Sequence, residues 1–211
     1  MENIFTEIFE KNKWGSSQSV SGPSSTLERT INLRNQLPEL FEKYFIRTVF
    51  DAPCGDMNWM KEVLKHANIN YMGGDIVKPL IERHKEEFSQ ISKVNFFHID
   101  LTKDKFPIAD LMISRDFLFH LSYKDAAKFL KNFLESKIKF LLTTTHINNN
   151  KFQNKDIPTG SWRWMDLLSH PYNFSQNPLV KILDGGGDRY MCLWTRSQIE
   201  QAYKTFSSHT A

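Results

Sequence analysis

The stretch Val49-Phe50-Asp51-Ala52-Pro53-Cys54-Gly55-Asp56 decides the fold of this chain. An apolar, β-branched run ends in a carboxylate and then breaks at Pro and Gly, which predicts a buried strand followed by a tight turn. The turn has neither the G-x-G-x-x-G spacing of a dinucleotide-binding loop nor the G-x-x-x-x-G-K-[ST] spacing of a P-loop. Pro53 stands where an aspartate-based phosphohydrolase would carry its second Asp.

Short apolar runs alternate with helical patterns on both sides of this stretch. The predicted strands span residues 48–52, 70–77, 94–101, 109–114, 139–145, 180–183 and 189–195. The predicted helices span residues 1–13, 26–44, 58–67, 79–91, 124–136 and 197–206. This alternation predicts βαβ units and a mostly parallel sheet, and the glycine run between the last two strands predicts a hairpin. We also expect Pro38 to kink or divide its helix, and Ser197 with Glu200 to form a capping box.

Composition excludes several classes of protein. The chain has 211 residues, 40% of them hydrophobic, a net charge of +3 and only two Cys. These values favour one folded α/β domain and argue against a disulfide scaffold or a Cys-rich zinc site. No apolar run reaches the ~18–20 residues of a membrane span, and the N-terminus lacks a signal peptide's basic start. We therefore expect a soluble, cytoplasmic protein without an integral membrane segment.

The first 46 residues differ from the rest. An amphipathic pattern over residues 1–13 is followed by the small-residue segment 14–25, which begins with Trp14. The segment could be a flexible linker, but a Trp is unusual in a linker. We therefore divide the chain into an N-terminal helical arm, residues 1–46, and an α/β domain, residues 47–211.

Four acidic residues each follow a predicted strand: Asp51, Asp75, Asp100 and Asp116. In an open parallel sheet, ligands bind at the carboxyl ends of the strands, where helix N-termini also point. Each Asp alone could simply cap the next helix. Four in succession favour a ligand site along one edge of the sheet.

The order of these motifs resembles that of class I S-adenosylmethionine-dependent methyltransferases. The segment 51–57 keeps the acid and the middle Gly of the family's first motif, while Pro and Met replace its flanking glycines. The resemblance implies an α/β, Rossmann-like fold with a mostly parallel seven-stranded sheet, an antiparallel C-terminal hairpin and an N-terminal helical arm. It implies S-adenosyl-L-methionine as cofactor, bound through Asp51 and Gly55. It further implies that Asp75 binds the ribose hydroxyls and that Ile76, Asp100 and Leu101 surround the adenine.

The match is closer to small bacterial methyltransferases often encoded with capsule or surface-polysaccharide genes. It is carried by the segments 14–25, 51–56, 114–121, 156–163 and 191–194. This resemblance implies O-methylation of a small carbohydrate or nucleotide-linked acceptor, with a phosphoramidate as one possibility, in surface polysaccharide biosynthesis. In such an enzyme the segment 14–25 would cover the cofactor as a lid. Four cofactor contacts are predicted within this segment: Trp14, Ser21, Gly22 and Ser24. Arg29 and Arg115 are predicted cofactor contacts outside it.

Three residues are candidate general bases for transfer to a hydroxyl. Asp116 and His120 are spaced i, i+4, so that a helical turn would place them on one face. His has an ordinary pKa near neutrality, which suits proton transfer. His146, after the fifth strand, is a second candidate. The alternatives are a helix-packing role for His120, a capping role for Asp116 and a solvent-facing strand end for His146.

Acceptor binding is predicted for Arg115, Trp162 and Arg163, because aromatic and guanidinium groups suit a sugar, a nucleobase or a phosphate. Trp162 or Trp164 could instead anchor its loop to the core. Asp116, His120 and His146 could also ligate a metal ion, but their spacing does not require one and we predict none.

Other functions remain open at this level. A nucleic-acid methyltransferase is disfavoured, because Ser114-Arg115-Asp116-Phe117 replaces the Asn-Pro-Pro-Tyr type of motif and basic residues are scattered. A Rossmann-like metal-dependent hydrolase could use the strand-end carboxylates. A non-catalytic binding protein is the third alternative. The sequence leaves a monomer and a homodimer equally open.

Overall fold

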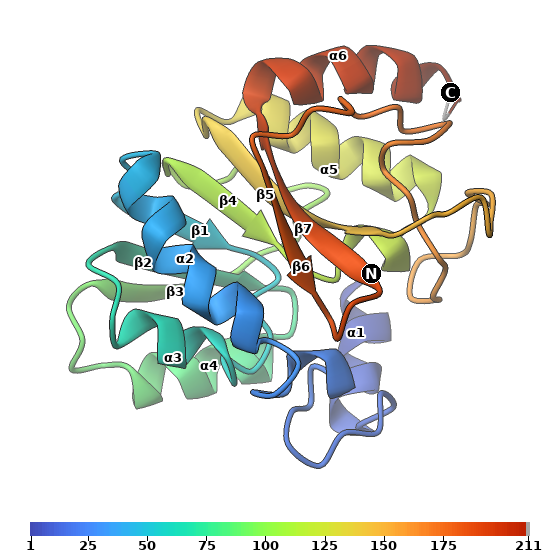
Figure 1. The fold of residues 1–211 in the computed structure, drawn as a ribbon. Coiled ribbons are helices and arrows are strands. Elements are labelled where there is room, and N and C mark those ends of the chain that lie inside the picture. The colour runs from blue at the N-terminus through green and yellow to red at the C-terminus, as the bar shows by residue number, and fades with distance from the viewer. Residues whose placement is uncertain (210–211) are drawn as a thin grey trace.

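A computed structural model describes residues 1–209 of the chain. The chain is built around one seven-stranded sheet, whose arrangement Figure 1 shows. The strand order is β3-β2-β1-β4-β5-β7-β6. Neighbouring strands from β3 to β5 run parallel, whereas β7 is antiparallel to both β5 and β6. The strands are β1 (Thr48–Asp51), β2 (Asn70–Asp75), β3 (Val94–His98), β4 (Leu111–Ser114), β5 (Phe140–His146), β6 (Val180–Asp184) and β7 (Arg189–Thr195). The predicted mostly parallel sheet with an antiparallel C-terminal hairpin is confirmed.

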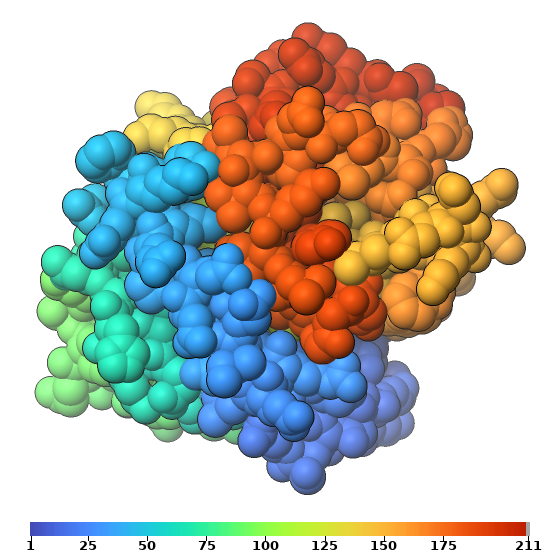
Figure 2. Space-filling view, in the orientation of Figure 1, coloured from blue at the N-terminus to red at the C-terminus, as the bar shows by residue number. Residues whose placement is uncertain are grey.

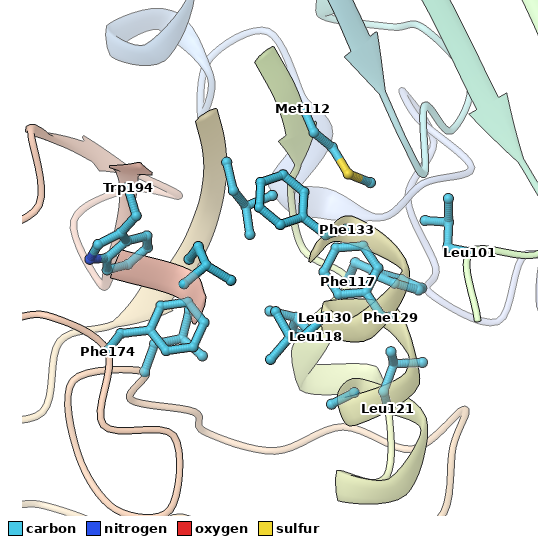
Figure 3. Close-up of a cluster of buried hydrophobic side chains, with 14 of the residues drawn as sticks. Leu101, Met112, Phe117, Leu118, Leu121, Phe129, Leu130, Phe133, Phe174 and Trp194 are labelled. Carbon is cyan, nitrogen blue, oxygen red and sulfur yellow. The ribbon is translucent and has the colours of Figure 1, made fainter. Parts of the chain in front are cut away.

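Helices cover both faces of the sheet and enclose a separate apolar cluster on each (Figure 1). One face carries α2 (Ile31–Lys43), α3 (Met60–Leu64) and α4 (Lys78–Glu87), and the other carries α5 (Tyr123–Glu135) and α6 (Arg196–Phe206). Figure 3 shows the side chains that α5 places in the second cluster together with Phe174 and Trp194. This double cover explains why β1, β4 and β5 are buried along nearly their whole length.

The N-terminal arm crosses the end of the sheet to which β1, β2 and β4 point (Figure 1). Its first helix, α1 (Glu2–Glu10), buries Phe5 and Ile8 against Val77 and Leu80. A loop then leads to the short 3₁₀ turn η1 (Pro23–Ser25). In the space-filling view the blue arm lies against the orange-red hairpin between β6 and β7 (Figure 2). Arg29 and Asn32 make this contact by donating to the Gly185 and Leu183 carbonyls at 2.7 and 2.6 Å.

Two local expectations are corrected. The helix predicted to kink or divide at Pro38 is not divided there: α2 continues through Pro38 from Ile31 to Lys43, and its Leu37, Leu40 and Phe41 side chains are buried. The capping box of α6 is formed by Thr195 and Gln198 rather than by Ser197 and Glu200, because the N-cap lies two residues earlier than predicted. In the described part of the chain, no helix combines the length and apolar character needed to cross a bilayer.

Candidate functional site

A cavity of about 460 Å³ opens at the carboxyl ends of the parallel strands. Its walls come from the turn after β1, the end of β2, the loop after β4 and the arm. It brings together twelve of the residues singled out in the sequence: Trp14, Ser21, Gly22, Ser24, Arg29, Gly55, Asp75, Ile76, Arg115, Asp116, His120 and Trp162. The site therefore occupies the edge where an open α/β sheet binds ligands.

The turn after β1 is held by the carboxylate of Asp75. Gly55 and Val77 donate their backbone N–H groups to its two oxygens at 3.1 and 3.0 Å. Burial nevertheless raises the pKa of Asp75, although these two hydrogen bonds oppose the rise. Gly55 has φ +55°, and a Cβ there would lie 2.3 Å from the Ser21 hydroxyl. Glycine is therefore required by the backbone conformation and by the arm that lies against it.

Two of the other strand-end acids, Asp51 and Asp100, lie outside the cavity lining. Asp51 is buried beneath the turn and accepts from the Tyr71 hydroxyl at 2.8 Å, and burial raises the pKa of Asp51 to about 7. Asp100 accepts from the backbone N–H and hydroxyl of Thr102 and pairs with Lys103, so its carboxylate closes a local turn. Leu101 lines a second, much smaller cavity beside Ile76.

The arm is attached to the same turn through Asp56. Val20 donates its N–H to Asp56 Oδ2 at 2.9 Å, and the Ser21 hydroxyl donates to Oδ1 at 3.2 Å. The backbone N–H of Asp56 donates in return to Ser21 Oγ at 3.0 Å. Farther along the arm, the Ser25 carbonyl accepts from Asn58 at 2.9 Å. These hydrogen bonds make the arm part of the cavity wall.

Three buried side chains, Arg115, Asp184 and Arg189, form a charged network with the partly buried Asp116 beside the cavity. Arg115 Nε lies 2.8 Å from Asp184 Oδ2, and Arg115 Nη1 lies 3.3 Å from Asp116 Oδ2. Arg189 Nη2 lies 3.2 Å from the same Asp116 oxygen. Burial alone would raise the pKa of Asp116, but the two guanidinium charges hold it at about 2. Asp116 is therefore a fixed carboxylate and a weak base.

Asp116 is also bound by neutral groups. The Ser24 hydroxyl of the arm donates to it at 2.7 Å and the Thr144 hydroxyl at 3.1 Å. Asp116 has φ +54°, and the turn after it is a 3₁₀ helix, η2 (Leu118–His120). The expectation that Asp116 and His120 share one face of an α-helical turn is thus wrong, although both line the cavity.

His120 has the geometry of a neutral base. Its Nδ1 lies 2.8 Å from the Ser161 carbonyl, which only accepts, so Nδ1 carries the proton and Nε2 keeps its lone pair. Burial lowers the pKa of His120, which favours this neutral form. Its ring stacks on Trp14 of the arm, with centroids 5.3 Å apart, and contacts Phe119. Packing thus fixes its orientation in the cavity wall.

The remaining candidates lie in or behind the loop after β5. His146 is buried behind Phe119 and Trp162, outside the cavity lining, and its Nδ1 meets the Met165 backbone. Arg163 also points away from the cavity: its guanidinium bonds the Leu118 carbonyl and the Tyr172 hydroxyl. The predicted acceptor contact of Arg163 therefore has no support in its position.

Trp162 and Trp164 are 50% and 44% exposed, so neither is a buried anchor of this loop. Trp162 lines the cavity, and its ring meets that of Trp164 at 5.1 Å.

Three functional candidates were missed in the sequence. Arg189 lines the cavity and Asp184 holds Arg115, and both flank the glycine hairpin, a position that could have marked them. His84 of α4 contacts the turn after β1, and its spacing from Leu80 and Ile81 would have placed it on the buried helix face. Within residues 1–209 no three His, Cys, Asp or Glu side chains gather as a metal site, so Asp116, His120 and His146 do not form one.

Several solved methyltransferases have this fold. The methyltransferase domain of bacterial CtHen1-CN is 18% identical, with a TM-score of 0.58, over 78% of this chain and 97% of that one. The mitomycin 7-O-methyltransferase MmcR is 12% identical, with a TM-score of 0.58, over 79% of this chain and 54% of that one. No family model and no curated protein matches the sequence. The chain therefore has the Rossmann-like fold of class I methyltransferases.

Proposed function

We propose that this protein is an S-adenosylmethionine-dependent O-methyltransferase that acts on a small acceptor. The observation that carries the proposal is His120, a neutral imidazole with a free Nε2 lone pair in the wall of the cavity. The cavity lies where this fold places its ligands. A positioned base of this kind suits removal of a proton from an acceptor hydroxyl.

The cavity has the groups that the methyl donor requires. S-adenosylmethionine would supply an electrophilic methyl group on a sulfonium. Asp75 presents a buried carboxylate that can accept from the two ribose hydroxyls, and Ile76 beside it offers an apolar surface for the adenine. Gly55, Ser21 and Ser24 leave room and polar groups for the amino acid end, with Arg29 at the rim. We propose that the arm, residues 1–46, acts as the lid of the domain formed by residues 47–211.

The chain's own residues can position an acceptor. Trp14, Phe119 and Trp162 give the cavity aromatic walls, which suit the apolar face of a sugar or a nucleobase. Arg189 and Arg115 add donors for polar substituents. Exclusion of water by these walls and alignment of a hydroxyl with the methyl group provide the main rate advantage. We infer a carbohydrate or nucleotide-linked acceptor, and the sequence resemblance favours a cytoplasmic role in surface polysaccharide biosynthesis.

A calorimetric titration with S-adenosylhomocysteine, with and without EDTA, tests the cofactor assignment. We expect saturable 1:1 binding that EDTA does not change, followed by methyl transfer from labelled donor to a sugar or nucleotide-sugar in an acceptor screen. Absence of binding by folded protein would overturn the proposal. It would instead favour the metal-dependent hydrolase or the non-catalytic binding protein. Binding that EDTA abolishes would show that a metal ion takes part in cofactor binding.

A further inference from the structure

The imidazole of His84 lies under the turn after β1 and does not line the cavity. It is fully buried on α4, and its Nε2 lies 2.8 Å from the Gly55 carbonyl oxygen. Because a carbonyl only accepts, Nε2 carries the proton and donates. Within the described residues Nδ1 has no hydrogen-bond partner, and the ring packs against Phe88 and Phe96. The hydrogen bond from this buried ring therefore goes to the backbone of the turn after β1.

The carbonyl that His84 binds belongs to the peptide that holds the arm. A trans peptide is planar, so its C=O and N–H point in opposite directions. The C=O of the Gly55–Asp56 peptide points to His84, and its N–H donates to Ser21 Oγ at 3.0 Å. Cys54 Sγ makes only a weak, 3.7 Å contact with the same carbonyl. His84 thus sets the direction of the N–H group that receives the arm.

The turn needs such a constraint because it contains a glycine. Gly55 has access to a wide range of backbone angles, and its two adjacent peptides can rotate without a side-chain clash of their own. Asp75 holds the peptide before Gly55 through its N–H at 3.1 Å, and His84 holds the peptide after it. The two side chains together fix the rim that faces Ser21.

We propose that His84 is a positioning residue, which orients the Gly55–Asp56 peptide and so couples the arm to the cofactor-binding turn. That the turn binds S-adenosylmethionine rests on the proposed function, whereas the role of His84 in the attachment of the arm does not. Loss of the Nε2 donor frees the peptide to rotate, the Ser21 contact weakens, and the cavity loses part of its wall. A histidine that only filled space beside Phe88 and Phe96 would have none of these effects.

The test compares three variants with the wild type. His84→Phe keeps the ring but loses the donor, and His84→Gln restores an amide N–H near the position of Nε2. Phe88→Leu reduces the packing around His84 and keeps the hydrogen bond. Two quantities are measured: hydrogen exchange of residues 14–25 in the ligand-free protein, and the S-adenosylhomocysteine dissociation constant.

We expect His84→Phe to raise both the exchange rate of the arm and the dissociation constant by about tenfold. His84→Gln and Phe88→Leu should stay within about threefold of wild type in both. Wild-type values in His84→Phe, or equal changes in all three variants, would overturn the proposal. If His84→Phe does not fold, His84→Asn replaces it, because its shorter amide stops short of the Gly55 carbonyl. If the wild type binds no S-adenosylhomocysteine, the proposed function fails, and the exchange data still decide the role of His84.

Discussion

At the scale of single residues, one backbone carbonyl decides which nitrogen of His120 can act as a base. Ser161 holds the Nδ1 proton, so the active lone pair is on Nε2. We predict that His120→Gln lowers kcat by about 10²–10⁴-fold, the usual contribution of a positioned base. The S-adenosylhomocysteine affinity should change little. Methyl-transfer rates with labelled donor and the acceptor found in the screen provide the measurement.

The acidic side of the rate profile gives a second check on His120. Its lowered pKa keeps the imidazole neutral at neutral pH, and kcat falls only when acid protonates it below the ordinary value of 6.5. His120→Gln should lose this inflection. His146→Gln should keep it, because His146 lies behind the cavity wall. A variant of His146 that alone lost the inflection would reverse the assignment of the base.

Asp116 is expected to matter for stability rather than for proton transfer. Its carboxylate compensates Arg115 and Arg189 within a buried network. We predict that Asp116→Asn lowers the free energy of unfolding by about 3–5 kcal/mol, since it leaves two buried guanidinium groups to share the Asp184 carboxylate. Urea denaturation measures this loss. An unchanged unfolding midpoint would show that the network is solvated in solution.

At the scale of elements, the arm depends on a few hydrogen bonds to the turn after β1. Ser21→Ala removes the hydroxyl that both accepts from the Asp56 N–H and donates to its carboxylate. We predict faster hydrogen exchange over residues 14–25, with exchange in the sheet unchanged, because the arm is a local unit above the core. Lys11→Ala is the control, as it breaks only an exposed pair with Glu7. Equal exchange in Ser21→Ala and wild type would contradict this attachment.

The sequence predicts the helices and strands better than it predicts which groups each side chain contacts. Alternating apolar runs and helical patterns identify the strands and the C-terminal hairpin, because burial on both faces of the sheet constrains composition over whole segments. Arg163 is a residue whose contacts the sequence does not predict. A basic residue between two Trp suggests ligand binding, yet its guanidinium donates a hydrogen bond to the Tyr172 hydroxyl. The partner of this guanidinium depends on how the loop after β5 packs, and the sequence of a loop has no hydrophobic periodicity from which to predict its packing.

The same limit applies to the site. Asp75 and His120 are predicted because their positions follow from strand ends. Asp184 and Arg189 lie far along the chain from Arg115 and Asp116. The four residues come together only because β7 pairs with β5 in the sheet.

At the scale of the whole molecule, buried histidines govern the response to acid. Burial lowers the pKa values of His84, His120 and His146 below the ordinary 6.5. The unfolded chain therefore takes up these protons first, and the stability is complete above about pH 6.5 and falls below it. Asp51 and Asp75 oppose this trend, because their raised pKa values favour the native state in acid.

Three histidines against two carboxyl groups predict a net loss of stability on acidification. We expect the urea midpoint to be lower at about pH 5.5 than at about pH 6.5, with a slope of up to about 1.4 kcal/mol per pH unit for each net proton. A midpoint that stays constant or rises would contradict the prediction and show that proton uptake by the folded protein matches or exceeds that of the unfolded chain.

The attachment of the arm has a consequence for turnover. Ser24 touches Asp116 and Trp14 stacks on His120, so residues near the chain's start complete the wall around the reacting groups. Under the proposed function, a nucleoside bound beneath that wall would be held by the arm until the arm lifts. Each catalytic cycle would then contain an opening and a closing step besides the chemistry, and such steps commonly limit kcat. The enzyme would bind its donor first, release its spent donor last, and show a burst of methylated product before the steady state.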